Sequence, residues 1–158
     1  MERRLAAILA ADIVGYSRLI GLNEEATLER LSALRQEVIA PAVSAHHGRV
    51  VKFLGDGFLA EFSSVLDALA AGLLIHGKTA ERNRSLPEEQ RIRHRIGVNQ
   101  GDVVVQDDDV YGDTVNIAAR LEGLAEQRVY RSDWPGGAST SGFTPASFSH
   151  LLFRYCKS

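Results

Sequence analysis

A chain of 158 residues, 45% hydrophobic and 24% charged, can bury one apolar core but is too short for two full domains. Its 18 lysines and arginines and 20 aspartates and glutamates give a net charge of −2, which excludes a broad basic surface for nucleic acid or anionic lipid. We therefore expect a single domain that meets any anionic ligand at a local site.

Three features favour a cytoplasmic protein without a membrane segment. Arg3 and Arg4 precede an apolar run, as in a signal peptide, but Asp12 interrupts this run after seven residues. No uncharged stretch reaches the roughly 18 apolar residues that a membrane-spanning helix requires. The only cysteine, Cys156, cannot form an internal disulfide, which is typical of a reducing compartment.

The first 48 residues predict a strand followed by a long helix. Residues 5–14 form a short apolar run, which indicates a buried strand, although its alanines also suit a helix. Asn23 is placed to cap a helix that begins at Glu24, because leucines then recur at helical spacing. Pro41 is expected to end or kink this helix, and Gly48 offers a C-terminal cap.

A β-hairpin and a second helix follow. Residues 49–54 and 58–62 are rich in β-forming residues and are joined by Gly-Asp-Gly, the composition of a tight turn, so they are expected to pair antiparallel. Ser64 opens a capping-box-like sequence for a helix that runs to about Asn83. Polar residues 84–91 are predicted to form a loop.

The next elements complete an α+β fold. Residues 92–98 and 103–105 predict two strands, parted by polar residues 99–102, and a third helix is expected over 114–126. The order strand, helix, strand, strand, helix, strand is that of the ferredoxin-like βαββαβ arrangement. This arrangement is an antiparallel sheet with helices on one face.

Two aspartates are the first candidates for chemistry. Asp12 and Asp56 each close an apolar, strand-like run, and each is followed by glycine within three residues. If adjacent strands bring these carboxylates together, they repel each other unless a hard divalent cation lies between them. Oxygen-only ligands suit Mg²⁺ or Mn²⁺, so a metal and a polyphosphate are the leading hypothesis.

Two further spacings are weaker signals. On an extended strand Lys52 and Asp56 point to one face, where a solvated ion pair is the plain alternative to a functional role. Asn116 and Arg120 lie at i and i+4 on the third predicted helix. Such a pair would bind a substrate oxygen and a phosphate, or else the two residues are ordinary polar residues on the surface.

Three motifs taken together are more specific. They are Asp12-Ile-Val-Gly-Tyr-Ser17, Lys52-Phe-Leu-Gly-Asp-Gly57 and Asp109-Val-Tyr-Gly-Asp-Thr-Val-Asn-Ile-Ala-Ala-Arg120-Leu-Glu122. In this order they resemble the motifs of the class III nucleotidyl cyclase catalytic domain, and the last block is highly specific. The resemblance spans residues 5–126 and is closest to the bacterial adenylate cyclases.

The resemblance implies a site for two metal ions and a triphosphate. Asp12 and Asp56 match the family's metal-binding carboxylates, and the backbone carbonyl of Ile13 matches a further ligand. Two-metal catalysis then activates the ribose 3′-hydroxyl and neutralises the leaving pyrophosphate. Residues Gly15, Tyr16 and Ser17 match the turn whose amides receive phosphate oxygens.

The resemblance also implies the substrate and the assembly. Lys52 and Asp109 match the pair that reads adenine, through a donor to ring N1 and an acceptor for the N6 amino group, which points to ATP. Asn116 and Arg120 match the pair that orients the ribose and stabilises charge on the α-phosphate. In the family this last pair comes from the other subunit, so a homodimer with shared sites is expected.

The chain departs from the family pattern after Glu126. Residues 127–158 are rich in Ser, Gly, Thr and Pro and are predicted to be a divergent tail, which leaves residues 1–126 as the catalytic domain. The family's phosphate-binding lysine has no assigned counterpart among Arg128, Arg131, Arg154 and Lys157. Two hypotheses follow: an adenylate cyclase that converts ATP to cyclic AMP and pyrophosphate, or a degenerate cyclase-homology module that binds nucleotide or a partner without turnover.

Overall fold

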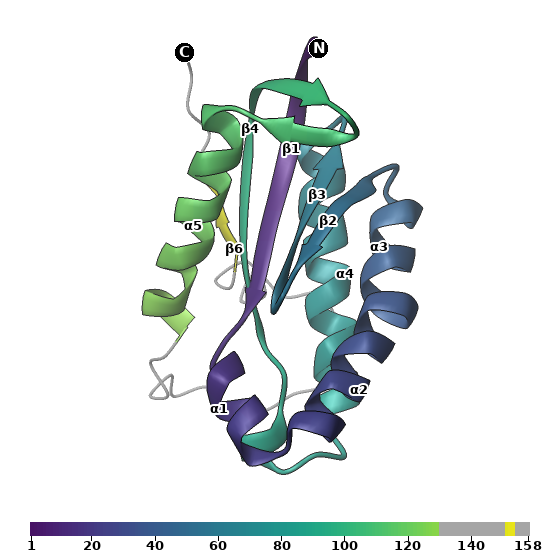
Figure 1. Ribbon diagram of the computed structural model, residues 1–158, viewed down its shortest axis with the longest axis vertical. Coiled ribbons are helices and arrows are strands. Elements are labelled where there is room, and N and C mark those ends of the chain that lie inside the picture. The colour runs from purple at the N-terminus through teal and green to yellow at the C-terminus, as the bar shows by residue number, and fades with distance from the viewer. Residues whose placement is uncertain (130–150, 154–158) are drawn as a thin grey trace.

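The computed structural model of the protein describes residues 1–129 and 151–153, with side chains to residue 125. In Figure 1 a central sheet has α5 on one side and α2, α3 and α4 on the other. The elements in chain order are β1 (Glu2–Ile13), α1 (Tyr16–Leu22), α2 (Glu24–Leu34), a π-helical segment (Arg35–Ile39), α3 (Ala40–Ala45), β2 (Arg49–Leu54), β3 (Gly57–Phe62), α4 (Val65–Asn83), a 3-10 turn (Glu88–Gln90), β4 (His94–Gln106), β5 (Asp109–Tyr111), α5 (Asp113–Val129) and β6 (Leu151–Phe153).

The sheet is built around β1. Its strands follow the order β2-β3-β1-β4-β5, in which all neighbours are antiparallel, and β6 pairs with β4 in parallel. This order confirms the predicted ferredoxin-like βαββαβ arrangement and its antiparallel sheet. The hairpin of β2 and β3 and the helix caps at Asn23 and Ser64 are also confirmed, since each cap side chain accepts a backbone N–H of the following helix.

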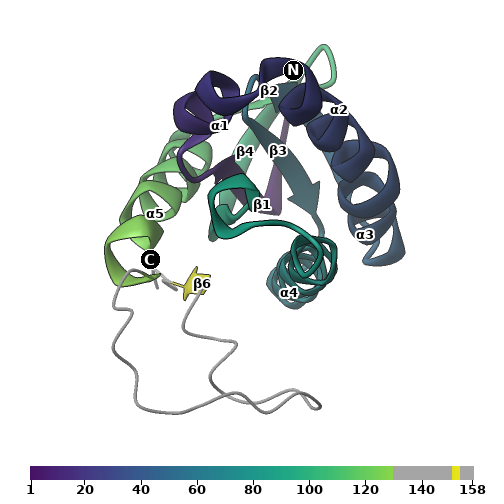
Figure 2. The same ribbon diagram turned by 90° about the horizontal axis from the view of Figure 1, so that it is seen from below.

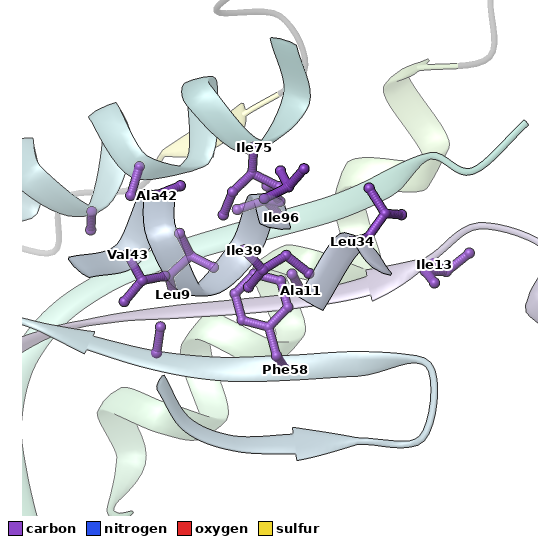
Figure 3. Close-up of a cluster of buried hydrophobic side chains, with 14 of the residues drawn as sticks. Leu9, Ala11, Ile13, Leu34, Ile39, Ala42, Val43, Phe58, Ile75 and Ile96 are labelled. Atoms are coloured by element: carbon purple, nitrogen blue, oxygen red, sulfur yellow. The ribbon is translucent and has the colours of Figure 1, made fainter. Parts of the chain in front are cut away.

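One face of the sheet holds the larger apolar core. Leu9 of β1 and Phe58 of β3 face the helices, where Ile39 and Ile75 pack against them, and Ile96 extends the contact along β4 (Figure 3). Each of these five side chains is 2% exposed or less. Burial of such a side chain contributes roughly 1.5–3 kcal/mol relative to its exposure, so this layer supplies much of the stability.

The other face lies under α5 and has a smaller core. Side chains alternate along a strand, so Ile8 of β1 points away from Leu9 and toward Ala118 of α5. Leu59, Val103 and Val110 complete this second cluster. The first two predicted helices therefore cover one face of the sheet, as expected, while the third covers part of the opposite face (Figure 2).

The sheet is curled so strongly that its two ends meet. Although β3, β1 and β4 separate β2 from β5, Lys52 of β2 contacts Asp109 of β5. Figure 1 shows the cause, because β4 bends at its upper end and carries β5 across the top of the sheet.

The strand β4 corrects the sequence-based prediction of two strands parted by residues 99–102. It is one continuous strand, since β1 offers an unbroken row of partners from Glu2 opposite Val105 to Ile13 opposite His94. Backbone pairing along this row keeps the polar residues in the ladder. Asn99 is buried, and its side-chain amide donates to the Thr114 carbonyl at 3.3 Å.

The long first helix continues past Pro41, where an end or a kink was expected. A π-helical segment, Arg35–Ile39, leads directly into α3, and Pro41 falls in the first turn of α3. At the far end His47, with φ of 58°, takes the left-handed position. Gly48 donates its N–H to the Val43 carbonyl at 2.9 Å, and a Cβ at Gly48 would lie 2.4 Å from the Phe62 ring.

Most of the predicted tail lies outside the described residues. The helix α5 continues to Val129, three residues beyond the expected domain end, and β6 lies within the tail. The boundary between residues 126 and 127 stays a prediction. Residues 130–150 and 154–158, which include Arg131, Arg154, Lys157 and Cys156, are not described.

None of the helices in the described part of the chain is long and apolar enough to cross a membrane.

Candidate active site

The structure brings Asp12 and Asp56 to the same end of neighbouring strands. Asp12 is the penultimate residue of β1, and Asp56 lies in the turn between β2 and β3. Antiparallel pairing sets Ala11 opposite Phe58, so the turn sits beside the end of β1. The approach is close because a Cβ on Gly57 would lie 2.2 Å from the Ala11 carbonyl oxygen. Residue 57 must therefore be glycine for Asp56 to reach this position.

Asp12 is held by a cation that sequence reasoning missed. Arg95 lies directly opposite Asp12 in the register of β1 and β4. Its Nε is 2.7 Å from Asp12 Oδ1, its Nη2 contacts Asp12 Oδ2, and its Nε is also 3.1 Å from Glu122 Oε1. A two-point guanidinium contact fixes the plane of the carboxylate. The contact follows from the register of β1 and β4, which joins two residues that are 83 positions apart in sequence.

Glu122 reaches this cluster because α5 packs tightly on β4. A Cβ at Gly97 would lie 2.3 Å from the Ala118 carbonyl oxygen and from the Glu122 nitrogen, so glycine allows the approach. Burial, followed by contact with Asp12 and the nearby charge of Asp56, raises the pKa of Glu122 to about 8, against the opposing effect of Arg95. Glu122 is therefore largely protonated near pH 7.

The donor chemistry at this end fits a divalent cation that shares its ligands with a substrate. No group of three or more Asp, Glu, His or Cys side chains within the described ranges forms a ready protein cage for a metal. Mg²⁺ commonly binds one or two carboxylates and completes its octahedron with water and substrate phosphates. Asp12 and Asp56 supply such carboxylates, and Ile13 offers only its backbone carbonyl, because its side chain is 2% exposed.

Lys52 and Asp109 form an ion pair across the two ends of the curled sheet. Lys52 Nζ lies 2.6 and 2.8 Å from the two carboxylate oxygens of Asp109. This hydrogen bond is the main reason why the pKa of Asp109 falls below its usual value, and the Val110 N–H donates to the same carboxylate at 2.8 Å. Lys52 and Asp109 thus lie together, as the family resemblance implies.

The alternative ion pair between Lys52 and Asp56 does not form in the described part of the chain. A register shift between Val50 and Lys52 interrupts the regular alternation of β2, and Asp56 lies in the turn rather than in the strand. The solvated ion pair given above as the alternative to a functional role is therefore not formed, because Lys52 pairs with Asp109 instead.

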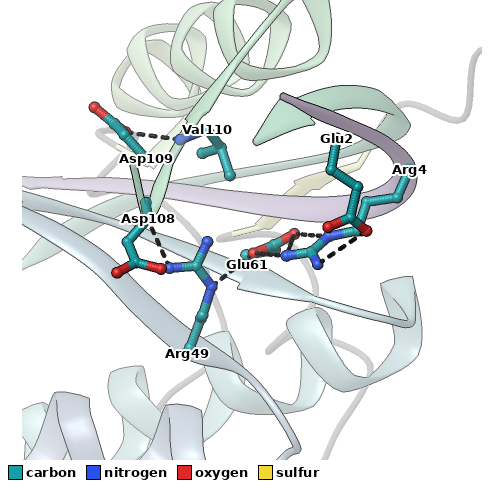
Figure 4. Close-up of polar contacts among 7 residues, drawn as sticks. All are labelled: Glu2, Arg4, Arg49, Glu61, Asp108, Asp109 and Val110. Atoms are coloured by element: carbon teal, nitrogen blue, oxygen red, sulfur yellow. Dashed lines mark hydrogen bonds and ion pairs between the residues drawn. The ribbon is translucent and has the colours of Figure 1, made fainter. Parts of the chain in front are cut away.

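A buried carboxylate supports the position of Asp109. Glu61 of β3 is 6% exposed and accepts from Arg4 at 2.9 Å and from Arg49 at 2.8 Å. Arg49 also donates to the Asp108 carbonyl at 2.9 Å, as Figure 4 shows, so the charge network ties β2 to the turn before β5. Sequence reasoning did not single out these residues.

The turn after β1 has a backbone suited to an anion. Gly15 adopts φ of 66° and ψ of 34°, a left-handed conformation that favours glycine, and serves as the N-cap of α1. Tyr16 and Ser17 follow as the first residues of this short helix, whose opening amides have no partner within the helix. The sequence did not predict α1.

Asn116 and Arg120 are exposed on α5, and neither side chain forms a hydrogen bond or ion pair with another described residue. Residues two apart on an α-helix differ by about 200° in direction. Because Glu122 points at Asp12, Arg120 faces the opposite side of α5. The structure therefore does not bring Arg120 to the Asp12 cluster of its own chain.

A buried histidine lies on the other face of the sheet. His94 is 6% exposed, and its ring meets Phe58 edge-on at a centroid distance of 6.4 Å. Burial, reinforced by the charge of His76 and opposed by that of Asp12, lowers the pKa of His94 to about 4. The ring is therefore neutral near pH 7.

Known proteins resemble this chain over most of its length. A sequence model described as the adenylate and guanylate cyclase catalytic domain matches residues 3–130. Putative adenylate cyclase 3 of Rhizobium meliloti is 48% identical over 141 residues, which cover 89% of this chain and 23% of that protein. An adenylate cyclase of Streptomyces coelicolor is 36% identical over 79% of this chain and 31% of its own length.

The fold matches solved structures as well. The crystal structure of an adenylate/guanylate cyclase/hydrolase from Silicibacter pomeroyi superposes with a TM-score of 0.72 at 47% identity, covering 78% of this chain and 72% of that one. A bacterial light-regulated adenylyl cyclase shares the fold with a TM-score of 0.70 at 24% identity, covering 80% and 73% of the two chains. The chain spans less than a third of the length of the two curated relatives above.

Proposed function

The chain belongs to the adenylate and guanylate cyclase catalytic domain family, and from this premise we propose that it is an adenylate cyclase that converts ATP to 3′,5′-cyclic AMP and pyrophosphate. The observation that carries the choice of ATP is the ion pair between Lys52 and Asp109. The names of the two curated bacterial relatives support the same choice.

Adenine presents an acceptor at ring N1 and a donor at its N6 amino group. The Lys52 ammonium has protons to donate to N1, and the Asp109 carboxylate accepts from N6. Guanine presents the reverse pattern at these two positions, so it would leave both side chains facing groups of the wrong kind. The lowered pKa of Asp109 keeps its carboxylate an acceptor.

Asp12, Asp56 and the Ile13 carbonyl are the proposed ligands for two Mg²⁺ or Mn²⁺ ions. Such ions, when bound, lower the pKa of the ribose 3′-hydroxyl and neutralise charge on the triphosphate. The chain contributes a carboxylate fixed in orientation, because Arg95 holds Asp12 and Glu122 holds Arg95 from α5. The amides of Tyr16 and Ser17 after Gly15 are the proposed receptors of phosphate oxygens.

Asn116 and Arg120 are proposed to complete the site of a second copy in a homodimer. Both are exposed and make no contact with their own Asp12 cluster, from which Arg120 points away. A guanidinium is well suited to the charge that develops on an α-phosphate in the transition state. In the dimer each active site would combine metal ligands of one protomer with Asn116 and Arg120 of its partner.

Formation of cyclic AMP by the purified protein tests the proposal. ATP with Mn²⁺, and separately with Mg²⁺, is expected to yield cyclic AMP, while GTP is expected to yield much less cyclic GMP. A metal-free reaction is the control. Binding of ATP without product from a folded dimer would instead assign the chain to the alternative, a nucleotide-binding module.

Exchange of the base-reading pair tests the substrate. Lys52→Glu together with Asp109→Cys should shift preference from ATP toward GTP, because a site that hydrogen-bonds its substrate rejects a base that leaves its polar groups unpaired. Competition between the two nucleotides measures the shift. An unaltered ratio would mean that these residues do not read the base.

Mixing two inactive variants tests the shared site. Asp56→Asn and Arg120→Ala should each be inactive alone, yet a mixture should recover part of the activity. In the heterodimer one site has intact metal ligands and an intact Arg120, while the other site carries both substitutions. Light scattering first establishes that the dimer forms. A mixed dimer without recovered activity, from variants of an active protein, would reject the shared site.

A further inference from the structure

A hollow lies between α2 and α4, away from the α5 face and its candidate active site. It has a volume of about 320 Å³, at the lower end of the range for small-molecule sites. Ala33 and Leu34 of α2, Leu86 after α4, and Ile92 before β4 give it an apolar lining. Five polar side chains, those of Arg30, Thr79, Arg82, Asn83 and Ser85, also line it.

Two of these polar side chains have buried donors without partners. Thr79 of α4 is 3% exposed, and its Oγ1 has no hydrogen-bond partner. The Nε of Arg30 on α2 is likewise buried and unpartnered. A buried donor without an acceptor is destabilising, and folded proteins rarely contain one. Two such donors beside one hollow indicate that an acceptor from outside the chain belongs there.

The charges around the hollow indicate what kind of acceptor it is. Arg82, the other charged residue of the lining, is already neutralised by an ion pair with Glu37. Arg30 donates from Nη1 to the uncharged side chain of Gln90 at 3.2 Å, and no described carboxylate pairs with it. The hollow therefore presents one uncompensated positive charge. A single negative charge matches it, whereas a phosphate dianion would lack a second free cation.

We propose that this hollow, defined by Arg30, Thr79 and the apolar residues between them, binds a small monocarboxylate with an apolar body. The carboxylate accepts from Arg30 and from the Thr79 hydroxyl, and the apolar body packs on Leu34 and Ile92. A charge-assisted contact of this kind is roughly twice as strong as a neutral one. The proposal does not depend on the cyclase activity, and its test does not measure it.

Octanoate is a suitable probe because it joins one carboxylate to a flexible apolar chain. Calorimetric titration into the wild-type protein should give saturable binding at one site. 1-Octanol has the same chain without the charge and should bind at least about tenfold more weakly, since it loses the charge-assisted contact. Inorganic phosphate should not displace octanoate.

Variants place the binding at this hollow. Arg30→Gln should weaken octanoate binding by about tenfold or more and Thr79→Val by about threefold to tenfold, because each removes one donor. Ala33→Leu fills the hollow from a half-buried position and should abolish binding without changing any polar group. Arg84→Gln, an exposed arginine at the end of α4 outside the hollow, is the matched control and should bind like the wild type.

Circular dichroism verifies that each variant is folded, and Thr79→Val keeps the shape of the side chain. Absence of octanoate binding to the wild type would overturn the proposal. So would equal affinity for octanol, or unchanged affinity in both Arg30→Gln and Ala33→Leu. Displacement of octanoate by phosphate would identify the occupant as an inorganic anion and would overturn it too.

Discussion

The two faces of the sheet differ in what their side chains do. The face under α2, α3 and α4 is almost wholly apolar, with His94 its buried exception, and it holds the larger core. The α5 face carries the ion pair of Lys52 and Asp109, the network around Glu61, and the cluster around Asp12. One face of the sheet thus supplies most of the stability, and the other carries the candidate chemistry. Substitutions on the apolar face should therefore leave activity largely intact, and substitutions on the α5 face should leave stability largely intact.

The largest effect is expected on the α5 face. Asp12→Asn should lower cyclase activity at least about a thousandfold, because a metal ligand is lost, while the free energy of unfolding changes by less than about 1 kcal/mol. Relief of repulsion with Asp56 offsets the lost contact with Arg95. Initial rates and urea unfolding measure the two quantities. Asp102→Asn, an exposed change on β4, is the control.

A large loss of stability is expected on the opposite face. Phe62→Ala should lower the free energy of unfolding by about 3–5 kcal/mol, because it empties a site that is 1% exposed. Activity per folded molecule should stay near that of the wild type. Leu66→Ala, at a position 74% exposed, is the control and should change stability by less than about 0.5 kcal/mol. Equal losses from both variants would contradict the assigned core.

The pH dependence of the free energy of unfolding tests the effect of His94, a buried polar side chain on the apolar face. The pKa of His94 is lowered from 6.5 to about 4. The contribution of the neutral His94 ring to the free energy of unfolding is therefore complete above pH 6.5 and is lost as the pH falls toward 4. Between pH 7.5 and 4.5 the wild type should lose about 2 kcal/mol more than His94→Leu does. Denaturant unfolding at both pH values measures this difference. Parallel losses in the two proteins would exclude His94 as the cause.

A smaller loss should follow when the buried carboxylate of the α5 face is neutralised. Glu61→Gln leaves Arg4 and Arg49 without their shared anion, but both arginines are more than a third exposed and therefore screened. We expect the free energy of unfolding to fall by about 1–2 kcal/mol. High salt should narrow the gap between variant and wild type. A gap that is independent of salt would point to packing rather than charge.

The smallest effect is expected at the turn before β5. Asp108 has φ of 63°, a left-handed conformation that costs aspartate more than glycine. Asp108→Gly should therefore raise the free energy of unfolding by about 0.5 kcal/mol or less, since the flexibility of glycine offsets part of the gain. Thermal unfolding measures the shift. A loss of stability would show that the Asp108 side chain has a structural role.

Local signals predicted the elements whose sequence carries them. Asn23 and Ser64 mark helix starts by their capping chemistry, and Gly-Asp-Gly marks the hairpin turn. The short α1 and β5 went unpredicted, because seven and three residues are too few to show a period. Residues 99–102 were misread as a break, since their polarity hid the pairing with β1.

The sequence predicted the position of candidate site residues only where local chain geometry determines it. Asp12 and Asp56 were candidates on the condition that adjacent strands join them, and the pairing of β1 with β3 places both at one end of these strands. Their role as metal ligands stays a prediction. Arg95 was missed because only the register between β1 and β4 sets it opposite Asp12. The roles of Lys52 and Asp109 came from family resemblance and stay predictions, although the structure does join the two side chains.

The register shift in β2 has a consequence for how the protein behaves in concentrated solution. Among the described strands only β3 shares a ladder with β2, so its outer edge is open to a strand from another molecule. A bulge disrupts such a template, and charged side chains oppose its desolvation. The shift between Val50 and Lys52, with Arg49 and Lys52 flanking it, therefore protects this edge against strand-to-strand aggregation.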